Sequence, residues 1–235
     1  MNKYKRFIDP LDYLHPPRCP ICDEIQTRGI CDPCRKELVF IREDYCMKCG
    51  KPLTEKREEY CADCRKRTHV FEAGRAVFSY QGRLKQSIYR LKYRGKQEYG
   101  RVFGAETARQ LGPWIARVQI TRIVPIPLHP ARKRERGYNQ AALIARELGR
   151  QLEIPVDESL LRRVKRTAPQ KTLTGAERRK NQTGAFALVG EIRPGERILL
   201  VDDIYTTGST ADAAAAELKR GGKCRIYVVV VAIGG

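Results

Sequence analysis

The segment Ile198–Thr210 constrains the fold more than any other part of the chain. An apolar run, Ile198–Val201, ends in the adjacent acids Asp202 and Asp203, and a short hydroxyl-rich loop then leads into the alanine-rich stretch Ala211–Lys219. This order predicts a buried strand, a tight turn and the N-terminus of a helix in series. The backbone amides of such a turn and the positive end of the helix dipole both favour a phosphate group.

The residues after the strand supply what a sugar phosphate needs. Gly208 allows the backbone to turn tightly and to come close to a ligand. Asp202 and Asp203 stand where their carboxylates can accept hydrogen bonds from sugar hydroxyls. We therefore expect a ribose 5-phosphate site, with a purely structural turn as the alternative. Besides the two acids, its expected binding residues are Tyr205, Thr206, Thr207, Gly208, Ser209 and Thr210.

The same segment resembles the binding motif of the type I phosphoribosyltransferases, which hold phosphoribosyl pyrophosphate (PRPP). The resemblance implies a mainly parallel sheet flanked by helices, with the ligand at the carboxyl ends of the strands. The alternation of apolar strands and helices beyond residue 70 predicts the same α/β class. The expected strands are 76–80, 120–125, 186–189, 198–201 and 224–233, and the expected helices are 84–93, 98–111, 139–152 and 211–219.

Eight of the nine cysteines form four C-x-x-C pairs in the N-terminal third. In a chain without a secretory signal this spacing indicates metal ligation, because two such pairs complete a closed tetrahedral zinc site of structural type. Pairing in sequence order is preferred because its loops are shorter. Interleaved pairing and a redox role are the alternatives. Sequential pairing gives one structural zinc site from Cys19, Cys22, Cys31 and Cys34, and a second from Cys46, Cys49, Cys61 and Cys64.

These sites divide the chain into a double zinc ribbon, residues 1–70, and a phosphoribosyltransferase-like domain, residues 71–235. Residues 15–70 carry too few apolar side chains for a core of their own, so the metal supplies the folding energy. His15 and His69 lie near the clusters. They are expected to be bystanders, because the sulfurs already satisfy both ions. The ninth cysteine, Cys224, is expected to be a small buried side chain.

The formal charge of +19 favours polyanionic partners such as nucleic acid or a phosphorylated ligand. Tyrosines lie among cations at residues 89–99, a mixture suited to stacking the bases of a single strand, although packing in a core or on a helix is the alternative. No apolar run reaches about 18 residues and the start lacks a signal-peptide pattern, so we expect a cytoplasmic protein without membrane insertion. The residues of this mixture are Tyr89, Tyr93, Tyr99, Arg90, Lys92, Arg94 and Lys96, and the second ribbon adds Lys51, Lys56, Arg57, Arg65, Lys66 and Arg67.

Two basic segments match loops of the phosphoribosyltransferases. The first, Ile126–Gln140, follows a predicted strand and has the position of the pyrophosphate loop. The second, Arg162–Phe186, has the position of the mobile catalytic loop, although a basic surface excursion is the alternative. For His129 the alternative is an ordinary solvent-exposed loop residue. The residues assigned to ligand or leaving-group contacts in these segments are Leu128, His129, Arg134, Arg136 and Lys171.

Taken together, the cysteine pairs, Arg136–Gln140, the Gln-Lys-Thr and Arg-Arg-Lys-Asn sequences of residues 170–181 and the motif at residues 201–210 resemble the ComF family of competence proteins. The resemblance implies a role in the uptake of single-stranded DNA during natural transformation, with other competence proteins as partners. It also implies a phosphoribosyltransferase-like domain whose own substrate is poorly defined.

Three functions are compatible with this pattern. An enzyme would bind PRPP with Mg²⁺, grip the ribose through Asp202 and Asp203, and neutralise the departing pyrophosphate with Arg134 and Lys171. Its acceptor is not indicated by any segment, and a place in nucleotide metabolism is the alternative to competence. A DNA-handling protein would keep the PRPP site for regulation. A non-catalytic scaffold would dock partners through the zinc ribbon.

Overall fold

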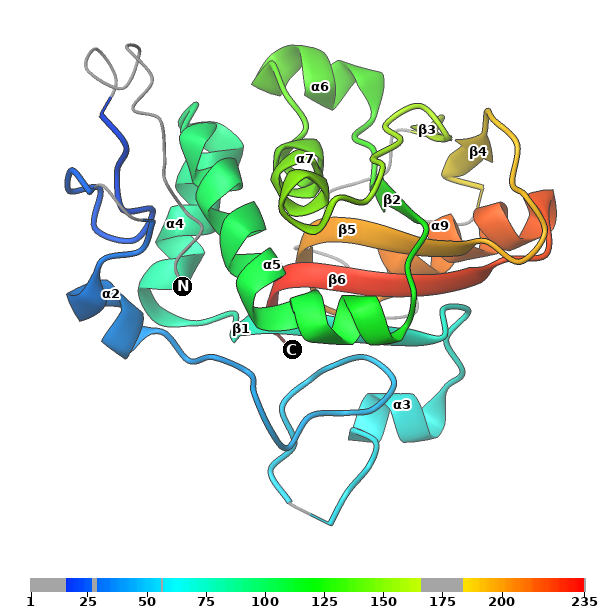
Figure 1. Cartoon of the computed structure of the whole chain (residues 1–235), viewed down its shortest axis with the longest axis horizontal. Coiled ribbons are helices and arrows are strands. Elements are labelled where there is room, and N and C mark those ends of the chain that lie inside the picture. The colour runs from blue at the N-terminus through cyan, green and yellow to red at the C-terminus, as the bar shows by residue number, and fades with distance from the viewer. Residues whose placement is uncertain (1–15, 27–28, 56, 166–183, 235) are drawn as a thin grey trace.

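The computed structural model describes residues 16–26, 29–55, 57–165 and 184–234. A parallel sheet with the strand order β1-β6-β5-β2 forms the centre of the molecule (Figure 1). Its central strands are rich in Val, Ile and Leu because both of their faces are buried. The strands are β1 (Ala73–Ser79), β2 (Arg122–Pro125), β5 (Arg197–Tyr205) and β6 (Arg225–Ile233).

Helices cover both faces of the sheet (Figure 1), which confirms the predicted fold class. α4, α5 and α7 lie on one face, while α9 and a short antiparallel pair, β3 and β4, lie on the other. The helices are α4 (Gly82–Tyr93), α5 (Glu98–Arg117), α6 (Pro130–Arg136), α7 (Gln140–Leu152) and α9 (Ser209–Gly221), and the short strands are β3 (Leu161–Arg163) and β4 (Phe186–Leu188). No helix in these described ranges is both long and apolar enough to cross a bilayer.

α5 and β5 extend furthest beyond their predicted ends. α5 continues past the predicted end at residue 111 and through Pro113, because Trp114 and Ile115 are buried against the sheet and tertiary packing outweighs local propensity. β5 continues past Val201 to Tyr205, because its last residues still pair with β6. The two acids therefore lie within a strand instead of in a loop after it.

The N-terminal ribbons dock on different faces of the sheet. The first contains α2 (Asp32–Glu37) and joins the core beneath α4 and α5, whereas the second contains α3 (Ala62–Lys66) and joins the core beneath α9. In the first ribbon, Asp23 accepts hydrogen bonds from Tyr99 (2.5 Å) and Lys96 (3.1 Å). Each ribbon thus completes one of the two cores.

The second ribbon meets β1 backbone to backbone. Gly74 N donates to Lys48 O at 2.7 Å, and Gly50, with φ of +81°, leaves no room for a Cβ against Gly74 O and Arg75 Cα. The segment that joins the ribbons also pairs with β1, since Ile41 N donates to Val77 O and Ser79 N donates to Val39 O, both at 2.9 Å. The open edge of the sheet is covered in this way.

Candidate ligand site and metal centres

Each ribbon gathers four sulfurs, and the pairing is sequential. Within each cluster all four Sγ atoms lie within 4.8 Å of one another, and the interleaved alternative is therefore wrong. The Cys22–Cys31 and Cys49–Cys61 sulfurs are 3.8 and 3.6 Å apart. A tetrahedral zinc ion with bonds of about 2.3 Å requires sulfurs about 3.8 Å apart. The two clusters therefore fit structural zinc ions with no open coordination position.

The thiols of each cluster differ in how readily they ionise. Burial opposes ionisation of Cys19 and Cys46, but backbone hydrogen bonds outweigh it and lower the pKa of each thiol to about 7. Burial, together with the charge of Cys46, raises the pKa of Cys64 to about 12. Neighbouring thiolates repel one another, and a bound dication removes that repulsion. Metal binding at these clusters consequently releases protons and weakens in acid.

A concave site lies at the turn that connects β5 to α9. Gly208 is the N-cap residue of α9 and provides no side-chain cap, which suits the helix terminus to an anion. Gly208 has φ of +75°, and a Cβ there would collide with the Tyr205 ring, so both backbone conformation and space require glycine. The hydroxyls of Thr207 and Ser209 are 2.8 Å apart. The lining consists of Ile126, Asp202, Ile204, Tyr205, Thr206, Thr207, Gly208, Ser209, Thr210, Ala211, Val228 and Val230.

The two acids of the motif face opposite sides of the sheet, because consecutive strand residues alternate. Asp202 lines the concave site, whereas Asp203 is 2% exposed and lies under α4 and α7. There Asp203 forms an ion pair with Lys92 at 2.5 Å and accepts a hydrogen bond from Gln140 at 3.4 Å. Asp202 therefore faces the concave site, and Asp203 contacts two helices on the opposite face of the sheet.

The environments of the acids drive their pKa values apart. Burial and the negative charge of Asp203 raise the pKa of Asp202 well above its ordinary value. Burial also acts on Asp203, but the Lys92 ammonium outweighs it and lowers the pKa of that carboxyl. In return, Asp203 raises the pKa of Lys92 against the effect of burial. The pair Asp203–Lys92 is thus the ionised one, and Asp202 holds its proton more firmly.

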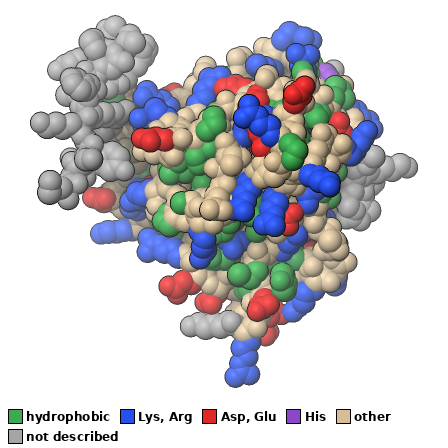
Figure 2. Space-filling model, turned by 45° about the vertical axis from the view of Figure 1, so that its right-hand side comes forward, with side chains coloured by type: hydrophobic (Ala, Val, Ile, Leu, Met, Phe, Trp, Pro, Cys, Tyr) green, Lys and Arg blue, Asp and Glu red, His purple; other side chains and the backbone are tan. Residues whose placement is uncertain are grey.

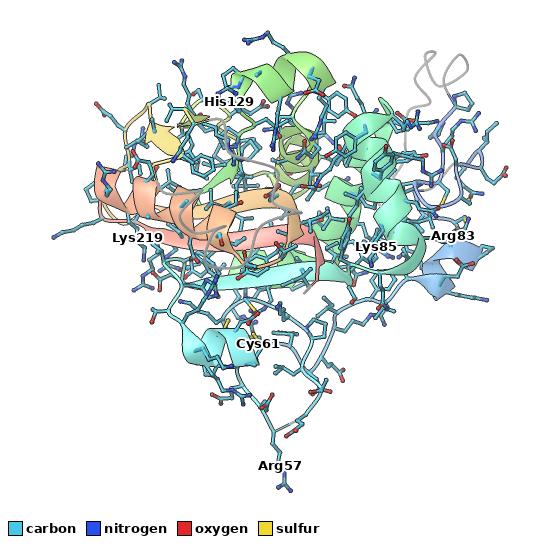
Figure 3. All side chains as sticks on the ribbon, turned by 180° about the vertical axis from the view of Figure 1, so that it is seen from behind. Arg57, Cys61, Arg83, Lys85, His129 and Lys219 are labelled. Atoms are coloured by element: carbon cyan, nitrogen blue, oxygen red, sulfur yellow. The ribbon has the colours of Figure 1, made fainter. Side chains whose placement is uncertain are left out.

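Of the predicted pyrophosphate segment, Ile126 belongs to this lining, whereas the residues assigned to ligand contacts lie outside it. His129 caps α6, where its Nδ1 accepts from Ala131 N at 3.2 Å; Figure 3 labels it. Leu128 is half-buried and Arg134 is exposed. The Arg136 guanidinium lies 5.0 Å from the Tyr93 ring centroid. Lys171 and most of the predicted catalytic loop lie outside the described residues.

Several of the tyrosines and cations predicted to contact a single strand stabilise the fold instead. Tyr99 is fully buried, and Lys92 and Lys96 are held by Asp203 and Asp23. Arg90 donates to backbone carbonyls of the first ribbon. Tyr89, Tyr93 and Arg94 remain at the surface. Packing is therefore the correct interpretation for Tyr99, because its hydroxyl finds a carboxylate partner inside.

The roles of Lys92, Gln140 and residues 67–70 of the second ribbon, which follow α3 and are called the ribbon tail below, were not predicted from the sequence. His69 is outside both metal clusters, as expected, but it is buried and bonded to α9 through Asp212 (Nδ1 to Oδ2, 2.8 Å). No local signal separates Lys92 from its basic neighbours, because its partner lies more than 100 residues away. These contacts depend on the packing of distant segments.

Comparisons with known families support this architecture. Residues 10–65 match the double zinc ribbon domain, and residues 135–234 match the phosphoribosyl transferase domain. Competence protein ComFC of Bacillus subtilis is 33% identical over 149 residues, which are 63% of this chain and 59% of that protein. The chain is similar in sequence to this ComF protein.

Two further similarities agree with the ComF resemblance. Competence protein F of Haemophilus influenzae is 41% identical over 108 residues, or 45% of this chain and 47% of that protein. The DNA utilization protein YhgH of Escherichia coli K12 is 36% identical over 107 residues, or 46% and 47%. The chain spans about half the length of these two relatives. Adenine phosphoribosyltransferase of Saccharomyces cerevisiae superposes with a TM-score of 0.39 at 18% identity, covering 70% of this chain and 82% of that one.

Proposed function

We propose that this ComF-type chain binds PRPP or a related ribose phosphate and takes part in handling single-stranded DNA during competence. The observation that carries the proposal is the concave site itself. It combines an uncapped helix N-terminus, a glycine at φ of +75° and one acid, Asp202, within the segment that matches phosphoribosyl transferases. Phosphate and sugar hydroxyls are the groups that this set of donors and acceptors recognises.

The binding mode follows from the orientation of each group. The 5-phosphate would accept hydrogen bonds from the backbone amides and hydroxyls of Thr206–Thr210, and Asp202 would face the ribose hydroxyls or the Mg²⁺ that accompanies PRPP. When bound, Mg²⁺ would offset pyrophosphate charge. Asp203 is already neutralised by Lys92 and would hold α4 and α7 in place. The site thus offers a ligand one acid, not two.

Binding is tested by calorimetry with ribose 5-phosphate, and with PRPP in the presence and absence of Mg²⁺. Thr206→Glu places a negative charge in the lining and should weaken binding by about tenfold or more. Thr54→Glu adds the same charge at an exposed ribbon position and should bind like the wild type. Equal affinities for the two variants would remove the site assignment. Pyrophosphate release with a panel of bases and amines decides whether the chain is also a transferase.

For single-stranded DNA, the face carried by α4 and α6 is the best-supported surface. Tyr89 and Tyr93 are 46% and 57% exposed, and their ring centroids are 5.0 Å apart. Arg136 lies over Tyr93, Arg94 is the exposed C-cap residue of α4, and Arg134 is exposed on α6. Aromatic rings beside cations suit the bases and phosphates of a single strand. On the face that Figure 2 shows, cations are interspersed with acids.

The surface is tested by fluorescence anisotropy with oligo-dT across a salt series. The double variant Tyr89→Ala with Tyr93→Ala should lose about 1–3 kcal/mol per stacked base and keep the salt dependence, because the phosphate contacts remain. Tyr60→Ala is the matched control, since Tyr60 is 43% exposed but lies on the second ribbon. A loss confined to Tyr60→Ala would place the DNA on the ribbon instead.

A further inference from the structure

The ribbon tail forms hydrogen bonds with the loop that precedes α9 and with the first turn of that helix. Arg67 donates to Thr207 O and, at 3.3 Å, to Asp212 Oδ2. His69 Nδ1 lies 2.8 Å from the same carboxylate, and Val70 N donates to Asp212 Oδ1 at 3.0 Å. Asp212 is in the first turn of α9, so these contacts fix both the helix start and the carbonyl of a residue that lines the ligand site.

The His69 ring is the buried centre of this contact. Its side chain is 1% exposed, and it stacks on Phe71 with ring centroids 4.8 Å apart. A carboxylate only accepts hydrogen bonds, so Nδ1 carries the proton toward Asp212. Nε2 is then the acceptor, and it faces both Arg67 Nε and the Tyr205 hydroxyl, each at 3.4 Å. Tyr205 in turn fills the space beside Gly208. The ribbon tail thus packs, through His69 and Tyr205, against the loop that contains Gly208.

The ribbon tail directly follows the second metal cluster in the chain. Cys61 and Cys64 flank the start of α3, which ends at Lys66, immediately before Arg67. The first cluster has no described contact of this kind with α9. Its ribbon instead reaches α4 and α5, through Arg90 and through an ion pair of Arg35 with Glu106.

We propose that the second cluster, acting through Arg67 and His69, holds the loop Tyr205–Thr210 in its ligand-binding form. Arg67 and His69 are positioning residues. Metal occupancy at this cluster, and not at the first, sets the order of the loop. Because an ordered loop presents its amides without further entropic cost, occupancy also sets the affinity for a sugar phosphate. That last step rests on the proposed function, whereas the ordering of the loop does not.

Amide hydrogen exchange of the ligand-free protein tests the ordering directly. His69→Ala and Cys64→Ser should speed exchange of the peptide covering residues 205–212 by about tenfold or more, because the contacts that close it are lost. Cys22→Ser, which damages only the first cluster, should leave that peptide unchanged and speed exchange in α4 and α5. His69→Asn keeps a donor in the place of Nδ1 and should restore slow exchange in part. A zinc assay verifies which ion each cysteine variant loses.

Arg67→Ala carries the test if Cys64→Ser does not fold, since Arg67 is 21% exposed and is not a metal ligand. Exchange that stays slow in both His69→Ala and Arg67→Ala would overturn the proposal, as would equal effects of Cys22→Ser and Cys64→Ser. Calorimetry with ribose 5-phosphate adds the second arm, in which Arg67→Ala should weaken binding by about tenfold. If the wild type fails to bind, the proposed function fails, and the exchange measurements still decide the role of the tail.

Discussion

Lys92→Met is the sharpest test of how the acid pair is accommodated. The substitution keeps the aliphatic stem and removes the ammonium, which leaves the Asp203 carboxylate buried next to Asp202 without its ion-pair partner. Removing one member of a buried pair costs about 3–5 kcal/mol, and Lys92 retains 20% exposure, so we expect about 3 kcal/mol. Lys85→Met, at an exposed position of the same helix, should change stability by less than about 0.5 kcal/mol.

Urea denaturation at fixed zinc concentration measures this loss and its dependence on pH. Asp203 has a lowered pKa, so its stabilisation is present above about pH 4 and is lost as the pH falls through the folded value. Lys92 has a raised pKa, so its share is present below about pH 10 and is lost as the pH rises through the folded value. Without Lys92, burial raises the pKa of Asp203. The deficit of Lys92→Met should therefore widen from pH 5 to pH 8.

A double variant separates the ion pair from simple packing. Lys92→Met combined with Asp203→Asn removes both charges and should recover at least half of the lost stability, because no uncompensated charge stays buried. A Lys92→Met protein with wild-type stability, or a deficit that is the same at pH 5 and pH 8, would refute the reasoning. The Lys92 ammonium would then be solvated and would not stabilise the Asp203 carboxylate.

Three further outcomes follow from the geometry. Gly208→Ala should abolish ribose 5-phosphate binding in calorimetry and lower the melting temperature, because a Cβ meets the Tyr205 ring and the residue has a positive φ. The protein should contain two zinc ions by metal assay and release them in acid, because protons compete with the metal for the cysteine thiolates; retention of both at about pH 4 would contradict this. Tyr99→Phe should cost about 1–3 kcal/mol in urea unfolding, because it removes a hydrogen bond to the charged Asp23 carboxylate, and an unchanged midpoint would show that water replaces the hydroxyl.

Local patterns predicted the parts of the molecule that local physics determines. The C-x-x-C spacing predicted the two four-cysteine clusters, and the order of strand, glycine turn and helix predicted the turn that lines the concave site. The sequence did not reveal that Asp202 and Asp203 face opposite sides of the sheet, because this orientation depends on how far β5 stays paired with β6. The partners of Lys92 and His69 likewise come from distant segments. The domain boundary at residue 70 and the role of Lys171 stay predictions.

The backbone contacts between the ribbon linker and β1 have a consequence for any shortened form of the protein. Residues 39–41 hydrogen-bond to the apolar strand β1, which would otherwise be an unpaired edge strand of the sheet. A truncated protein that begins at residue 71 would expose the edge of β1 to other protein molecules. Exposed edge strands of this kind pair with strands of other chains. By covering the edge of β1, the cysteine-rich third of the molecule is therefore also expected to limit self-association.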